Sequence, residues 1–173
     1  MNVERIIFHI NAYKAHGQIL DAANFVVREW ELDSRYFAGF GYRQECETTS
    51  ILLTTEGDFG SPQKIKIPVN LFDFDLGLVI NLIAHEMMHV EQRAAQKFVE
   101  DKNEREWQAY YEMLFHKRFP KIWDLSNFYK KFFIEKALVY YGRMREGSEL
   151  QHKYAGQKAE MEAYKKILTE QKN

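Results

Sequence analysis

The first third of the chain opens with apolar residues spaced three and four positions apart. The recurring positions are Ile6, Ile7, Ile10, Ile19, Ala22, Ala23, Val26, Val27 and Trp30. Because an α-helix turns once every ~3.6 residues, this spacing predicts helix from Val3 to about Leu32. The stretch reads either as one helix or as two segments broken near His16 and Gly17.

The pattern changes after residue 36, where aromatic and β-branched residues replace the helical spacing. Residues 50–55 read as a strand. A turn rich in Gly, Asp, Ser and Pro follows at 56–62, and residues 64–69 alternate Lys and Ile as a second strand. Antiparallel pairing of the two runs is the simplest topology. Since Pro68 cannot donate a hydrogen bond to a neighbouring strand, we expect the second strand at a sheet edge.

Helical spacing returns after Asp75, which we expect to cap the N-terminus of the longest helix. The predicted helices cover about residues 76–99, 104–116, 124–141 and 147–169, with a polar break at 100–103. With the N-terminal helix and the two strands, these elements indicate an α+β fold. It has a small antiparallel sheet and four to five helices in all.

Length and composition fit a single domain over residues 1–173. No apolar run reaches the about 18 residues that span a bilayer, and polar residues interrupt the start of the chain, unlike a secretory signal. The single cysteine, Cys46, cannot form an internal disulfide and is expected to pack in a strand. We therefore expect a soluble cytoplasmic protein without a membrane partner, and the oligomeric state stays open.

The chemistry of the chain centres on His85, Glu86 and His89 in the longest predicted helix. Residues four apart lie on one face of a helix, so the two imidazoles can meet at one tetrahedral zinc ion. Glu86 is displaced by one residue, and its carboxylate can reach a zinc-bound water. Zinc lowers the pKa of such a water toward ~7, and the carboxylate can take its proton. The competing interpretation is a pair of core histidines bonded to other buried groups.

A catalytic zinc needs a third protein ligand. Glu106 lies on an otherwise apolar face of the next predicted helix and is the best-placed candidate. Glu104 and Glu112 compete for this role from other faces of the same helix. Each can instead be an ordinary surface acid, a role that suits Glu104 best because it lies in the first turn.

The two histidines and Glu86, followed by Glu106, resemble the motif of the gluzincins, zincin metallopeptidases with a glutamate zinc ligand, over residues 76–113. The resemblance implies a zincin-like domain in which His85, His89 and Glu106 bind Zn²⁺ and Glu86 is the general base. It also implies hydrolysis of peptide bonds in a peptide or protein substrate.

The resemblance further implies that the edge strand, residues 64–69, packs on the active-site helix and aligns the substrate antiparallel to itself. The chain departs from the extended pattern at Glu91, where an apolar residue is preferred. Gln92 and Ala95 stand where the metzincin branch has Gly and His, which excludes that branch. Candidates for an oxyanion-stabilising residue are Tyr110, Tyr111, Tyr140, Tyr141, His116 and His152, and spacing does not choose among them.

The alternative is a non-catalytic protein that keeps the zincin fold and binds a partner. Residues 117–145 contain eight Lys or Arg against two acids, although the formal net charge of the chain is only −1. This basic segment is either a solvated helix face or a surface for an acidic partner or nucleic acid. The near-neutral overall charge argues against a dedicated nucleic-acid binder.

Overall fold

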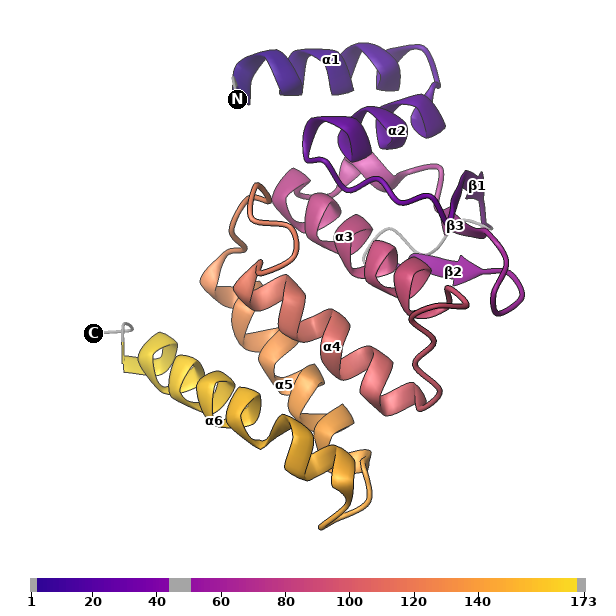
Figure 1. Cartoon of the computed structure of the whole chain (residues 1–173). Helices are drawn as coiled ribbons and strands as arrows, with labels where there is room; N and C mark the ends of the chain where they lie inside the picture. Colours follow the sequence, from indigo (N-terminus) through magenta and orange to yellow (C-terminus); the bar gives the residue numbers. More distant parts are fainter. Residues whose placement is uncertain (1–2, 44–50, 171–173) are drawn as a thin grey trace. The chain divides into compact units, whose positions relative to one another are not determined.

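The computed structural model describes residues 3–43 and 51–170 (Figure 1). The chain divides into two compact units, residues 1–98 and 99–173, which are treated separately below. The described residues form six α-helices, one short 3₁₀ helix and three strands, which confirms a mixed α+β protein. The helices outnumber the four to five expected. The single-domain organisation stays a prediction, and Cys46 lies outside the described residues.

The N-terminal helical stretch is two helices, α1 (Val3–Ala15) and α2 (Ile19–Glu29). The break lies at Gly17, whose φ of +69° is a left-handed conformation that glycine adopts without steric strain. Most of the predicted apolar positions are buried in both helices, among them Ile10 and Val26, whereas Ile7 is 43% exposed. The helical period therefore identified the core-facing side of this segment.

The sheet of the first unit is mixed and not purely antiparallel. Its strands are β1 (Phe37–Tyr42), β2 (Thr54–Glu56) and β3 (Gln63–Ile67), in the order β1-β3-β2. β2 pairs antiparallel with β3, as predicted. β1 pairs parallel with β3, so the prediction that residues 64–69 form an edge strand is wrong: β3 is the central strand. Pro68 is no obstacle, because it lies one residue past the end of β3 and is not needed as a donor.

The longest element of the first unit is α3 (Leu76–Gln92), preceded by the 3₁₀ helix η1 (Leu71–Asp73). The Asp75 side chain accepts a hydrogen bond from the Leu78 backbone N–H at 2.9 Å, which confirms the predicted cap. The helix ends seven residues earlier than residue 99. Arg93 explains this end, because its carbonyl accepts from Gly60 and its guanidinium donates to the Gly57 carbonyl. The chain after α3 is thereby tied to the turn between β2 and β3.

The second unit contains α4 (Lys102–Phe115), α5 (Asn127–Arg143) and α6 (Glu149–Glu170). Asp101 and Ser126 cap α4 and α5 by accepting hydrogen bonds from backbone N–H groups. Trp107 of α4 and Ile134 of α5 are fully buried, as is Met161 of α6. Across residues 3–43 and 51–170, none of the helices combines the length and apolar character needed to cross a bilayer.

Candidate metal centre

Two histidines converge on one face of α3. The Nε2 atoms of His85 and His89 lie 3.1 Å apart. Their rings stand almost perpendicular, at 89°, with centroids 4.7 Å apart. The four-residue spacing produces this approach, because one helical turn brings both side chains over the same patch of surface.

The spacing of the two Nε2 atoms fits a tetrahedral zinc ion. Imidazole nitrogens bind zinc at about 2.0–2.1 Å, so two of them at a tetrahedral angle lie about 3.3 Å apart. The observed 3.1 Å is within a few tenths of an ångström of that separation. His85, Glu86 and His89 also form a group whose ligand atoms all lie within 4.8 Å of one another. The residues present therefore fit the expected metal.

Gln92 holds the far side of the His89 ring. Its Oε1 atom lies 2.8 Å from His89 Nδ1, the nitrogen that does not face His85. Gln92 is the last residue of α3 and only 4% exposed. The contact is local, since residues three apart are neighbours on a helix.

The Glu86 carboxylate is buried and bonded to the sheet. The Thr55 hydroxyl of β2 lies 2.7 Å from Glu86 Oε2 and 3.1 Å from the Glu86 carbonyl oxygen. A hydroxyl has one proton to donate, and a charged carboxylate is the stronger acceptor. Thr55 thus fixes the direction of this carboxylate relative to α3, and Glu86 is 8% exposed.

Of the predicted site residues, His85, Glu86 and His89 lie together in the first unit, whereas the three candidates for the third ligand belong to α4 of the second unit. The choice of Glu106 stays a prediction. In its own unit Glu106 is half-buried and lies near Tyr140 of α5. Burial, and then the Glu106 charge, raise the pKa of the Tyr140 hydroxyl.

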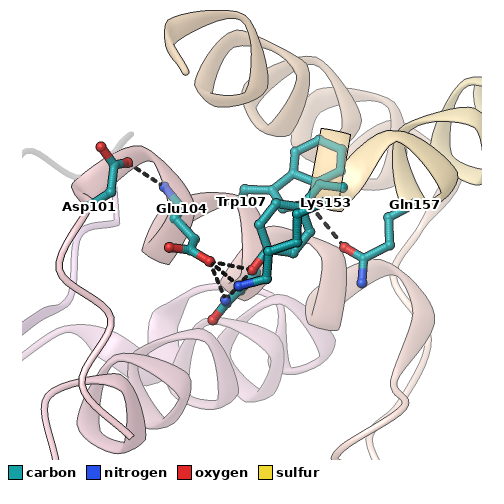
Figure 2. Close-up of polar contacts among 7 residues, drawn as sticks. Asp101, Glu104, Trp107, Lys153 and Gln157 are labelled. Carbon is teal, nitrogen blue, oxygen red and sulfur yellow. Dashed lines mark hydrogen bonds and ion pairs between the residues drawn. The ribbon is translucent and has the colours of Figure 1, made fainter. Parts of the chain in front are cut away.

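Glu104 is bonded inside the second unit. Tyr154 donates to its carboxylate at 2.5 Å and Lys153 at 2.7 Å, both from α6, as Figure 2 shows for Lys153. Burial and this carboxylate raise the pKa of Tyr154. The interpretation of Glu104 as a surface acid is wrong, because the side chain packs toward α6 and is only 8% exposed.

Glu112 is likewise engaged. Its Oε1 atom accepts hydrogen bonds from the backbone N–H groups of Arg118 and Phe119, each at 2.8 Å. The carboxylate thus provides hydrogen-bond acceptors for backbone N–H groups of the turn that follows α4. Burial outweighs these hydrogen bonds and raises the pKa of Glu112.

Several oxyanion candidates have partners within the second unit. Tyr111 is bonded to Glu160 and Lys117, and Tyr141 donates to the Gln151 carbonyl at 2.9 Å. His116 ends α4 with a left-handed φ of +46°, and burial lowers its pKa. The geometry within this unit favours no one of these residues for that role.

Sequence reasoning missed Thr55 and gave Gln92 no role at the site. The three-residue spacing from His89 could have revealed Gln92, because that spacing places both side chains on one helix face. No local signal identifies Thr55, which lies 31 residues before Glu86 and meets it only through the packing of β2 on α3.

The chain matches no family model, no curated protein and no solved structure. The resemblance to gluzincins therefore stays a prediction from the motif residues of the sequence.

Proposed function

We propose that the protein is a zinc-dependent metallopeptidase of the gluzincin type that hydrolyses peptide bonds. One observation carries the proposal: the Nε2 atoms of His85 and His89 meet at 3.1 Å beside the buried carboxylate of Glu86. The ring nitrogens of histidines in a protein core can form hydrogen bonds in many arrangements. A pair whose Nε2 atoms point at each other, next to a carboxylate, is the arrangement that a divalent cation binds.

In this proposal His85 and His89 bind zinc through Nε2, and Glu106 is the third ligand. Bound zinc supplies Lewis-acid activation of water and of the substrate carbonyl. Glu86 accepts the proton of the attacking water and passes it to the nitrogen of the leaving amine. Thr55 donates to Glu86 Oε2, which leaves the other carboxylate oxygen for this proton transfer.

The zincin character of the fold belongs to the same proposal. The contact of Thr55 with Glu86 joins a strand to the helix that carries both histidines, an arrangement that zincins use. Within the described residues, β2 pairs with β3 alone and is the edge strand next to α3. In this proposal β2, and not residues 64–69, is the edge strand that aligns the substrate.

The experiment compares the wild-type protein with Glu86→Gln and a matched control, Glu91→Gln on the same helix. Zinc stoichiometry and cleavage of a mixed peptide library are measured for all three. The proposal expects zinc in every protein and loss of cleavage only in Glu86→Gln. If the wild-type protein binds zinc and cleaves no peptide, the proposed peptidase activity is refuted.

That outcome would favour the alternative, a non-catalytic zincin-fold protein that binds an acidic partner or nucleic acid through residues 117–145. Part of the basic charge there is offset within the second unit, since Lys130 pairs with Asp124 and Lys117 with Glu160. Failure of the wild-type protein to bind zinc refutes the metal centre itself.

A further inference from the structure

The His89–Gln92 contact determines which nitrogen of His89 carries the proton. The Oε1 atom of a glutamine side chain accepts hydrogen bonds and donates none. With Oε1 placed 2.8 Å from His89 Nδ1, the contact assigns Nδ1 as the donor that carries the hydrogen. In neutral imidazole the other nitrogen, Nε2, then carries no hydrogen, and its lone pair can accept a hydrogen bond or bind a metal. This nitrogen is the one that faces His85.

We infer that Gln92 is a positioning residue that holds His89 in the tautomer and ring orientation that bind a metal through Nε2. The inference rests on the proposed metal centre and adds a residue that the histidine motif does not contain. Gln92 touches His89 and not the metal, so it acts through the ligand. Such partners of ligating histidines fix the ring and increase its basicity toward the metal.

The burial of Gln92 makes the contact effective. The side chain is 4% exposed, so water competes poorly for His89 Nδ1. The backbone at His89 is also held in helical conformation, because the Arg93 N–H donates a hydrogen bond to the His89 carbonyl at 3.1 Å. Both ends of the contact thus belong to the last turn of α3.

Two substitutions separate this role from simple packing. Gln92→Leu keeps a side chain of similar size but cannot accept from Nδ1. Gln92→Glu keeps an acceptor and adds a charge, which makes the acceptor stronger. Glu91→Leu is the matched control, because it places the same leucine at the adjacent position of α3.

The test measures the zinc dissociation constant by competition with a chromophoric chelator, and the ring ¹⁵N shifts of His89 in the metal-free protein. We expect Gln92→Leu to weaken zinc binding about 10- to 100-fold. Gln92→Glu should bind zinc at least as tightly as the wild type, and Glu91→Leu should bind it equally. The ¹⁵N shifts should show Nδ1–H in the wild type and a mixture of tautomers in Gln92→Leu.

Several results would overturn the inference. One is unchanged zinc affinity in a folded Gln92→Leu; another is an Nε2–H tautomer in the wild type. If Gln92→Leu does not fold, the ¹⁵N shifts of the wild type and the zinc affinity of Gln92→Glu still test the inference. Weaker zinc binding by Gln92→Glu than by the wild type contradicts the positioning role. If the wild type binds zinc and Gln92→Leu has the same zinc dissociation constant, only this inference is refuted. Wild-type protein that binds no zinc refutes the proposed function.

Discussion

The Thr55 hydroxyl lies 2.7 Å from Oε2 of Glu86 and joins β2 to the helix that carries both histidines. This contact defines the direction of a buried carboxylate in the first unit. It also connects the sheet to the proposed chemistry, since Glu86 is the proposed general base.

Substitution of Thr55 by valine should slow peptide hydrolysis without loss of zinc. Valine has nearly the same shape, so the change removes mainly the hydrogen bond. A hydrogen bond to a charged group contributes about 1.5–3 kcal/mol, and its loss in the transition state lowers kcat about 10- to 100-fold. Steady-state kinetics with a library-derived peptide measure the effect, and Thr55→Ser should retain most of the activity. Equal activity in Thr55→Val would show that Glu86 needs no such support.

Removal of either histidine should abolish stabilisation by zinc. A ligand that binds only the folded protein stabilises it by about 2.7 kcal/mol at a concentration 100 times its dissociation constant. We expect the wild-type midpoint of thermal unfolding to rise with added zinc and to fall back with a chelator. His85→Ala and His89→Ala should show neither change. A zinc-dependent rise that persists in both variants would place the metal elsewhere.

Among the acids of α4, only Glu106 should affect zinc affinity. Glu106→Gln removes the proposed charged ligand, and we expect at least tenfold weaker zinc binding, about 1.4 kcal/mol. Glu104→Gln and Glu112→Gln are matched controls, because their carboxylates are bonded within the second unit. They should change stability and leave the zinc dissociation constant unchanged. Zinc binding that weakens only in one of the controls would reassign the third ligand.

Glu112 should make stability depend on pH in the mildly acidic range. Burial raises its pKa in the folded protein, so the folded state holds this proton more tightly than the unfolded state. Stability therefore falls as pH rises from the ordinary carboxyl pKa through the raised value. Glu112→Gln still accepts from Phe119 and Arg118 but does not titrate.

Urea unfolding of the wild type and Glu112→Gln at a series of pH values measures this difference. The wild type should lose stability relative to the variant as pH rises through that window. A stability difference that stays constant with pH would contradict a raised pKa at Glu112.

The sequence by itself determined the features that depend on neighbours along the chain. The Asp75 cap and the antiparallel pairing of β2 with β3 follow from short-range geometry. The break at Gly17 was one of the two interpretations that the sequence left open. The placement of His85 and His89 on one face of α3 belongs to the same class, because a four-residue spacing brings their side chains side by side. The direction of the two rings, which brings the Nε2 atoms to 3.1 Å, depends on the packing around α3.

Only the tertiary structure decided the features that join distant segments. β3 is central because β1 pairs with its other side, and Pro68 alone could not reveal that. Thr55 meets Glu86, and Tyr154 meets Glu104, across separations of 31 and 50 residues. Such contacts depend on which apolar faces pack together when the core forms. A periodic pattern shows that a face is buried, but it does not say which polar group lies opposite.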